Sequence, residues 1–576
     1  MSYTKYHYIE TALNNIDPKL NIDKFSYKCF AFCYLAYCLN LKENDFKGNL
    51  ENLILVVNKK ENISSFLKRT LGEYMKKEGI LNPLKKVSVD ELKNYMVNFY
   101  AEKRLYSGEK AADVLSTPWE IAKLSTKLLE PEENDTVADF CIGTGSFSFS
   151  LLNEYEVKKI EGYEISNELA VVSEMIADVR GFEIEIHNQD LITTPLNNRM
   201  YTKIFCDCPF CLNVAHFSKE YSNETLLKNV KKIRSEYMFI QRVIDCLDNS
   251  GKAIVLVPLG ILNAKDGFLE NLISSGYLNA VIQLAPNLLF GTAIPFAILV
   301  LSYGNKTLKL INANEMYTKS RLKNQLSLND INDIANAYFD EDPKTSRCVS
   351  FNEIKEKGFN LALCNYFYEK KLSLKGVECK YLPLSELCTK PITRGVQYKA
   401  EELDSKESLA PTNIFYLSAN AIQDNKILKS LPTITDIEEK HLGYCVEDED
   451  IVIANINTNP VKVAVVNKDK DSQIIAASTL YIVRVNKDII SPYFLKILIE
   501  SKMGSHIFSV FNTGSIAISV DFLNTVLIPV LEMEDQLKIV NDYNECQKKI
   551  DMLKEGILSL ENMKSSVLDS FCKEGR

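Results

Sequence analysis

The alternation of short apolar strands with helices between residues 109 and 368 constrains the fold of this chain more than any other feature. Helices are predicted at 147–153 and 168–179, and strands at 137–140, 159–164, 182–187, 203–205, 252–257, 278–283 and 297–301, where the pattern closes. Such alternation indicates a mostly parallel, doubly wound α/β sheet. Ligands of such sheets bind at the carboxyl ends of the strands, near the point where the strand order reverses.

The regions on either side have different textures. Helical periodicity runs through residues 1–108, whereas residues 369–536 carry short β-type runs, polar turns and a few helices, which predicts an α+β domain. Residues 537–576 are expected to form one long helix with a coiled-coil-type heptad seam, which comprises Ile539, Tyr543, Cys546, Ile550, Leu553, Ile557 and Leu560. A seam of this length needs a partner helix. The expected fold is therefore multidomain, with an α-helical amino-terminal domain (1–108), an α/β domain (109–368), an α+β domain (369–536) and a spacer helix.

Composition limits the possible functions without choosing one. No apolar run among the 576 residues approaches the ~20 residues that span a bilayer, and the first residues lack the pattern of a signal peptide. The fifteen cysteines follow no repeated spacing, so reduced thiols in the cytoplasm are expected, with no membrane partner. A net charge of −9 argues against a protein that coats nucleic acid, although a sequence-specific binder with its basic residues in one cleft remains compatible.

Acidic residues follow three successive strands of the α/β region. Asp139 precedes a turn with Gly143 and Gly145, whose small size lets a ligand approach the backbone. Glu164 ends the next strand, where an acid commonly accepts hydrogen bonds from a ribose diol, and Asp190 follows in place to accept from an adenine amino group. The turn lacks the Lys-Ser/Thr pair of a triphosphate loop, so NAD, FAD and S-adenosylmethionine are the candidate ligands.

A fourth strand end carries the tetrapeptide Asp207-Cys208-Pro209-Phe210. An acid, a tight turn and an aromatic ring suit a site that grips an exocyclic amine and stacks on the ring that bears it. Cys206, Cys208 and Cys211 also raise the possibility of a metal site, but the spacing offers no clear fourth ligand. Buried free thiols are the favoured interpretation, and no metal is expected.

These motifs resemble those of adenine-N6 DNA methyltransferases, most closely the modification subunits of type I restriction–modification systems. The stretch DFCIGTGSF carries the family's donor motif at Asp139, Gly143, Gly145 and Phe147, and residues 251–262 and 278–301 match the family over their whole length. The resemblance implies a Rossmann-like fold and S-adenosylmethionine as the methyl donor. A Thr-Pro element of the family corresponds to Thr117 and Pro118, which are expected near the methionine end of the donor.

The resemblance also implies roles for the tetrapeptide. Asp207 and the backbone carbonyl of Cys208 would accept the two hydrogens of adenine N6, while Phe210 would stack on the flipped-out base. The family has proline where this chain has Cys208, so the fixed φ of proline is lost and a peptide N–H appears. A catalytically weak relative that acts as a DNA-binding subunit of a defence complex is therefore the alternative. A methyltransferase for RNA or protein and a dehydrogenase are disfavoured.

The carboxyl-terminal third resembles the target-recognition domain of a type I specificity subunit. The similar stretches are 381–388, 392–395, 416–422 and 450–454, followed by the long helix. The resemblance implies double-stranded DNA as a partner. Because a full specificity subunit has two recognition domains and two spacer helices, we expect a homodimer paired through residues 539–560. A separate restriction nuclease subunit is a further expected partner.

Overall fold

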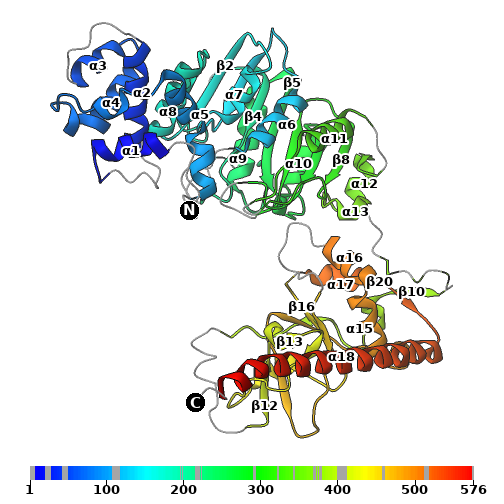
Figure 1. Ribbon diagram of the computed structural model, residues 1–576. Coiled ribbons are helices and arrows are strands. Elements are labelled where there is room, and N and C mark those ends of the chain that lie inside the picture. The colour runs from blue at the N-terminus through cyan, green and yellow to red at the C-terminus, as the bar shows by residue number, and fades with distance from the viewer. Residues whose placement is uncertain are drawn as a thin grey trace. The chain divides into compact units, whose positions relative to one another are not determined.

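The computed structural model describes residues 7–19, 27–41, 50–106, 117–194, 196, 199–214, 221, 224–289, 294–320, 323–340, 344–367, 371–372, 374, 376, 379–398, 412–456, 461–510 and 518–573. The chain forms two compact units, Met1–Leu363 and Cys364–Arg576 (Figure 1).

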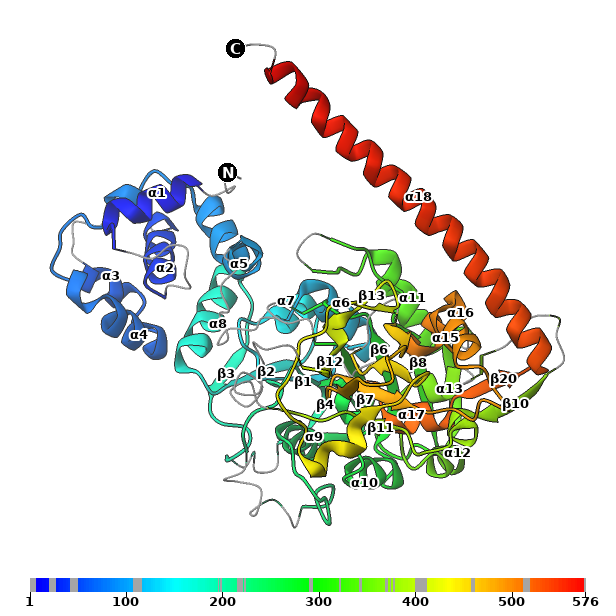
Figure 2. The same cartoon turned by 90° about the horizontal axis from the view of Figure 1, so that it is seen from below.

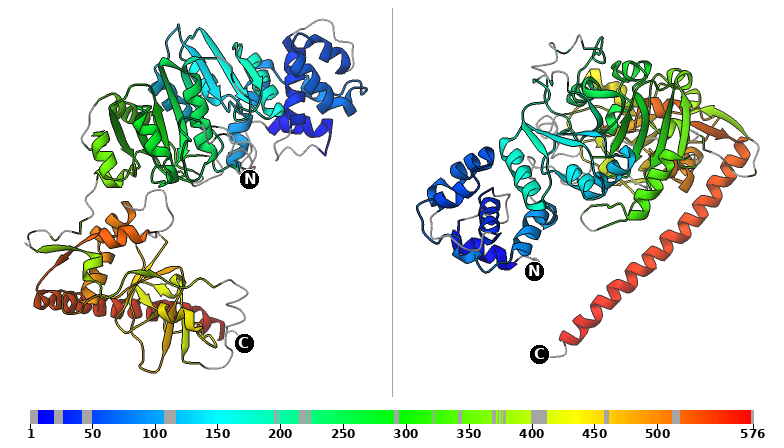
Figure 3. Two further views of the ribbon diagram at one scale, coloured as in Figure 1. Left: turned by 180° about the vertical axis from the view of Figure 1, so that it is seen from behind. Right: turned by 90° about the horizontal axis from the view of Figure 1, so that it is seen from above.

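The first unit begins with helices. These are α1 (His7–Ile16), α2 (Tyr27–Leu41), α3 (Leu50–Val56), α4 (Glu61–Leu71) and α5 (Val89–Tyr106), with 3-10 turns at Gly72–Tyr74 and Asn82–Leu84. Their buried side chains form one core with those of α8 (Asn167–Arg180), which lies between these helices and the strands (Figures 1 and 3). The hydroxyl of Tyr34 donates to Asp178 at 2.8 Å, and Arg69 pairs with Glu168 at 2.9 Å. Helix α8 therefore joins the helical region to the sheet.

A mixed nine-stranded sheet fills the rest of this unit. Its strands are β1 (Thr136–Phe140), β2 (Lys159–Glu164), β3 (Glu185–Asn188), β4 (Tyr201–Cys206), β5 (Leu247–Pro258), β6 (Leu278–Leu284), β7 (Phe296–Leu301), β8 (Thr307–Ala313) and β9 (Ser346–Ser350). The order is β3-β2-β1-β4-β5-β7-β6-β8-β9. Strand β7 runs antiparallel to β5 and β6, and β9 runs antiparallel to β8. The prediction that 297–301 closes the pattern is wrong, because β8 and β9 extend the sheet beyond it.

Helices cover this sheet. They are α6 (Trp119–Leu129), α7 (Ser146–Leu152), α8, α9 (Ser235–Cys246), α10 (Phe268–Ser274), α11 (Leu328–Phe339) and α12 (Phe351–Glu356), with a 3-10 turn at Leu259–Ile261. Helices α6, α7 and α11 share one core with the strands. No helix forms among the described residues between β3 and β4. The strand order reverses between β1 and β4, where Phe140 pairs with Cys206, so their carboxyl ends form the switch point.

The second unit combines small sheets with helices. Its strands are β10 (Lys380–Pro383), β11 (Thr393–Arg394), β12 (Ile414–Leu417), β13 (Ile422–Gln423), β14 (Lys426–Ile427), β15 (Cys445–Val446), β16 (Ile451–Ala454), β17 (Val463–Val465), β18 (Gln473–Ala476), β19 (Leu480–Val483) and β20 (Leu527–Val530). Its helices are α13 (Cys364–Phe367), α15 (Pro492–Glu500), α16 (Lys502–Val510), α17 (Val520–Thr525) and α18 (Met533–Lys573), with 3-10 turns at Leu384–Leu387, Ala419–Ala421 and Glu439–Tyr444. The sheets have the orders β11-β19-β16-β17 and β12-β18-β15, with the separate pairs β10-β20 and β13-β14.

The long helix α18 is anchored at its start (Figure 2). The fully buried side chain of Gln536 accepts a hydrogen bond from the Ser491 amide at 2.8 Å and donates to the Ile489 carbonyl at 2.9 Å. Because Ser491 is the N-cap of α15, the two helices are tied together at this point. No helix in the described part of the chain is long and apolar enough to cross a membrane.

Candidate functional site

The loop between β1 and α7 has an unusual backbone. Cys141, Gly143 and Gly145 all have positive φ values, at 65°, 55° and 80°. A Cβ atom on Gly145 would lie 2.4 Å from the ring of Phe149, so the second glycine is required by both its conformation and its surroundings. Cys141 adopts the same left-handed region without being glycine, at a cost of roughly 1 kcal/mol. The loop is thus held in a strained shape by the groups around it.

Two acids hold this loop. Asp139 is buried, and its carboxylate accepts hydrogen bonds from the Ser148 hydroxyl at 2.6 Å and the Ser148 amide at 3.3 Å, which fixes the first turn of α7. Glu164, at the end of β2, accepts from the amides of Gly143 at 3.0 Å and Ser166 at 2.9 Å. Burial raises the pKa of Asp139 to about 7, although the bonds from Ser148 oppose the shift. Burial likewise raises the pKa of Glu164.

The tetrapeptide lies at the neighbouring strand end. Asp207 follows β4, and its Oδ2 accepts a hydrogen bond of 2.5 Å from the hydroxyl of Thr117. Burial raises the pKa of Asp207 to about 6, and the bond from Thr117 limits the rise. Cys208 is buried with its thiol 3.8 Å from the Leu256 carbonyl, while Phe210 is half-buried against the core.

The turn after the tetrapeptide is anchored to the start of α9. The Cys211 amide donates to the carboxylate of Glu236 at 2.8 Å, and the Leu212 amide donates to the Ser235 hydroxyl at 3.0 Å. Both acceptor residues are buried. Sequence reasoning missed them, although a Ser-Glu pair at the start of a predicted helix signals side chains available to cap backbone amides. This anchoring restrains the turn from its carboxyl-terminal side.

The remaining predicted residues take different positions. Pro118 is the buried N-cap of α6, directly after Thr117. Phe147 stacks on Phe205 with ring centroids 4.2 Å apart and is only 1% exposed, so it packs beneath the loop. Asp190 accepts from the Ile192 amide at 2.8 Å and stabilises its own turn. Asn188, which was not predicted, donates to the Glu164 carbonyl at 2.9 Å and links β3 to the site.

Charge is unbalanced at this edge of the sheet. Asp139 and Glu164 are buried and Asp207 is half-buried, and no Lys or Arg in the described part of the chain forms an ion pair with any of them. Buried carboxylates without cationic partners are costly, which is why their pKa values rise. A positively charged ligand would relieve this cost, so the edge is suited to binding a cation that also offers hydrogen-bond donors.

A second polar network lies on strands β2 and β3. Glu161 is 2.7 Å from Nε2 of His187 and from the Lys159 ammonium, and it also pairs with Arg199. Burial opposes its ionisation, but the bonds from Lys159 and His187 and the charge of Arg199 lower its pKa to about 2. Glu161, Glu185 and His187 are the one group among the described residues whose ligand atoms are spaced to hold a metal. Lys159 and Arg199 already pair with Glu161, so we interpret the group as a structural network.

Comparison with known proteins points to one family for part of the chain. The sequence model of the family described as N-6 DNA Methylase matches residues 90–374. The methylase subunit of the type I restriction enzyme MpnII of Mycoplasma pneumoniae is 21% identical over 322 residues, which are 50% of this chain and 58% of that protein. An uncharacterised RNA methyltransferase of Nanoarchaeum equitans is 33% identical over 89 residues, 16% of this chain and 19% of that protein. The chain thus spans less than two thirds of the length of each of these two relatives.

A solved structure agrees with the fold. The type I restriction-modification system methyltransferase subunit from Streptococcus thermophilus superposes with a TM-score of 0.51 at 16% identity, over 63% of this chain and 98% of that one. The fold is therefore methyltransferase-like, with a large mixed sheet and flanking helices. The part of the chain that matches the family model, residues 90–374, is thus similar to the N-6 DNA Methylase family.

Proposed function

We propose that this chain is a site-specific DNA methyltransferase that transfers a methyl group from S-adenosylmethionine to N6 of a flipped-out adenine. The observation that carries the proposal is the position of Asp207, a half-buried carboxylate without a cationic partner among the described residues, at the strand end beside Asp139. The proposed setting is a restriction–modification or related defence system in the cytoplasm, which is where the DNA of such systems lies.

The donor site would be built on the loop after β1. We assign it to Thr117, Pro118, Asp139, Gly143, Gly145, Phe147, Glu164 and Asp190. The donor supplies a methyl group on a positively charged sulfonium, which fits an edge whose buried carboxyls lack basic partners. The glycines would let the ligand approach the backbone, and Phe147 would support the loop from below by stacking on Phe205.

The acceptor site would be built on the tetrapeptide. The lone pair of adenine N6 is delocalised into the ring, so the amine is a poor nucleophile. Asp207 and the Cys208 carbonyl would each accept one N6 hydrogen and redirect the lone pair out of the ring plane. Phe210 would stack on the base, with Pro209 shaping the turn. The main catalytic contribution would be the alignment of two bound reactants.

The second unit would select the DNA target. Its small sheets and connecting loops, in residues 369–536, would contact double-stranded DNA. Some side chains would bind phosphates to position the domain, and others would contact base edges to read the sequence. The support for this assignment is the sequence resemblance to type I recognition domains. A separate restriction nuclease is the expected partner.

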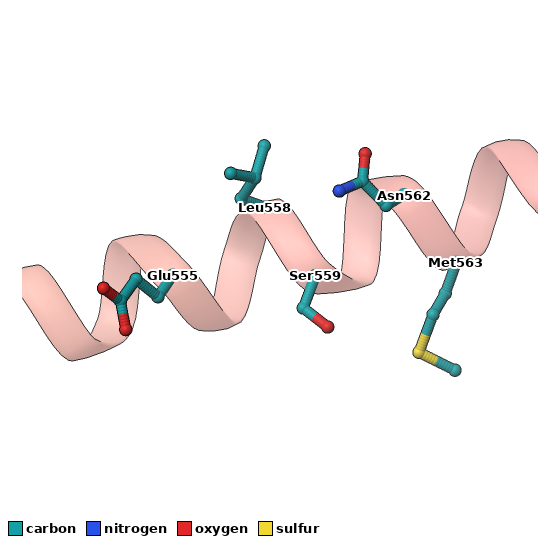
Figure 4. Close-up of a pocket in the computed structure, with 5 residues that line it drawn as sticks. All are labelled: Glu555, Leu558, Ser559, Asn562 and Met563. Atoms are coloured by element: carbon teal, nitrogen blue, oxygen red, sulfur yellow. The ribbon is translucent and has the colours of Figure 1, made fainter.

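We also propose that two chains pair through the seam 539–560 of α18. The start of the seam packs on its own unit, since Val540 is 8% exposed and Tyr543 bonds to Glu500. Farther along, Ile550, Leu553, Ile557 and Leu560 are 46–69% exposed. Figure 4 shows Glu555, Leu558, Ser559, Asn562 and Met563 on this stretch of the helix, where Leu558 and Met563 are also exposed. A second copy offers a matching apolar stripe.

The second candidate function is a DNA-binding subunit with weak catalysis. The observation that favours it is Cys208, which stands where the family has proline and whose peptide can rotate more freely. The site is otherwise the same, so the two functions differ in rate alone.

The first prediction concerns transfer itself. Labelled methyl groups from S-adenosylmethionine should appear on N6 of adenine in DNA of mixed sequence. Asp207→Ala should reduce the rate by about 100-fold or more, the loss typical of one preorganised hydrogen-bonding group. The control is Asp333→Ala, which removes an exposed carboxylate of α11 and should leave the rate unchanged. Label on cytosine, or full activity of Asp207→Ala, would refute the acceptor assignment.

The second prediction concerns pH. Only the ionised form of Asp207 has a free, negatively charged oxygen to accept the N6 hydrogen. The rate of methyl transfer should therefore rise with pH through the pKa of Asp207, about 6. Thr117→Val removes a bond that stabilises the ionised form, so the pKa of Asp207 should rise and the acid limb should move to higher pH. Thr117→Ser keeps the hydroxyl and should keep the limb in place. An unmoved limb in Thr117→Val would show that this bond does not set the ionisation of Asp207.

The third prediction separates the two candidate functions. Cys208→Pro restores the fixed φ that the family has at this position and should raise the rate of methyl transfer. Cys211→Pro is the control for a proline that does not fit the turn, and it should not raise the rate. Cys211 has a φ of 59°, which proline cannot adopt, and its amide is hydrogen-bonded. Transfer that is absent from the wild type and gained in Cys208→Pro would favour the DNA-binding subunit.

The fourth prediction concerns assembly. Sedimentation of the full chain should give a dimer, and Leu553→Glu combined with Ile557→Glu should give a monomer because charge is introduced into the apolar stripe. Met552→Glu is the control, since Met552 is 69% exposed but lies off the seam. A wild-type monomer at all concentrations would contradict the dimer.

A further inference from the structure

A cavity of about 310 Å³ lies among helices α5, α6, α7 and α8 of the first unit. Thr144 and Ser146 of the loop after β1 line it, as does Thr117, whose hydroxyl bonds to Asp207. From the helices, Lys123 of α6 and Arg180 of α8 reach it. The cavity therefore joins the proposed donor loop to a region that contains basic side chains.

Arg180 is the unusual member of this set. Its Nε is buried and has no hydrogen-bond partner, and no ion pair to a carboxylate is found for it among the described residues. Burial alone lowers its pKa, with no neighbouring acid to oppose the shift. A guanidinium normally finds a carboxylate or several acceptors when it is removed from water. Its solitary position is costly, and a bound anion would relieve the cost.

The guanidinium is close to the loop. The central carbon of the guanidinium lies 5.0 Å from the ring centroid of Phe149. This is the same ring that a Cβ atom on Gly145 would touch. One phenyl ring therefore separates Arg180 from the glycine turn. The other cation, Lys123, is already paired with Glu154 at 2.5 Å. The positive charge that remains in the cavity is that of Arg180.

The two sides of the loop thus carry unpaired charges of opposite sign. On the side of the strand ends, Asp139, Glu164 and Asp207 lack cations, and on the helix side Arg180 lacks an anion. A ligand with separated charges of both signs would satisfy both sides. S-adenosylmethionine has a sulfonium, an ammonium and, at the end of its amino-acid chain, a carboxylate.

We propose that the cavity receives the amino-acid end of the methyl donor and that Arg180 binds its carboxylate, an inference that rests on the proposed function. Arg180 is then a specificity-determining residue, which distinguishes the complete donor from adenosine derivatives that lack the amino-acid chain. Thr117 and Ser146 would line the path between the strand ends and Arg180.

Two ligands of the full chain test this. S-adenosylhomocysteine carries the amino-acid chain, whereas 5′-methylthioadenosine has the adenosine and sulfur without it. By calorimetric titration, Arg180→Gln should lower the affinity for S-adenosylhomocysteine by about 10- to 100-fold, the range for a lost hydrogen bond to a charged group. The same substitution should change the affinity for 5′-methylthioadenosine by less than about twofold. Arg180→Lys should restore part of the loss. Without ligand, Arg180→Gln should melt no lower than the wild type, because it removes a half-buried guanidinium that has no carboxylate partner among the described residues.

The matched control is Arg69→Gln, which removes an exposed arginine that pairs with the other end of α8 and should leave both affinities unchanged. Equal weakening of both ligands by Arg180→Gln, or no weakening of S-adenosylhomocysteine, overturns the role of Arg180 while leaving the donor site in place. A wild type that binds neither ligand overturns the proposed function as well, so the two failures are distinguishable.

Discussion

The parallel pairing of β1 with β4 is the constraint on which the site depends. Phe140 lies opposite Cys206, so the acid near the end of one strand and the acid after the other emerge at the same edge of the sheet. Asp139 and Asp207 are therefore neighbours in space although 68 positions separate them along the chain. Burial raises the pKa of Asp139, and the negative charges of Asp207 and Glu164 add to the rise. No basic side chain of the described residues forms an ion pair with Asp139 or Asp207. The fold brings together groups that repel one another in the absence of a ligand.

The protein stabilises this arrangement with backbone amides and hydroxyls. Ser148 donates to Asp139, Gly143 and Ser166 donate to Glu164, and Thr117 donates to Asp207. Hydrogen bonds of this kind hold a carboxylate in one orientation without cancelling its charge. The acids therefore stay oriented and remain available to a cation. Cys141 also has a left-handed backbone, which no local preference of cysteine would produce.

Sequence reasoning reached the architecture where local pattern determines it. Strands β1, β4 and β7 contain apolar runs, and the acids at the ends of β1, β2 and β4 were found because parallel strands align their carboxyl ends. Strands β8 and β9 were missed, since Thr307–Ala313 and Ser346–Ser350 contain few residues with strong strand preference and depend on pairing with β6 and with each other. The bond from Thr117 to Asp207 and the solitary charge of Arg180 could not be predicted, because each depends on side chains from distant segments.

The shared core around α8 has a consequence for folding cooperativity. Side chains of this helix pack into the helical region on one side, and Tyr34 and Arg69 bond to its polar groups. Neither the helices nor the strands can lose α8 and keep an intact interior, so both should unfold in a single transition. Backbone continuity between residues 106 and 117 is then dispensable once the protein has folded. A chain cut there would remain one particle, held by an interior to which both fragments contribute.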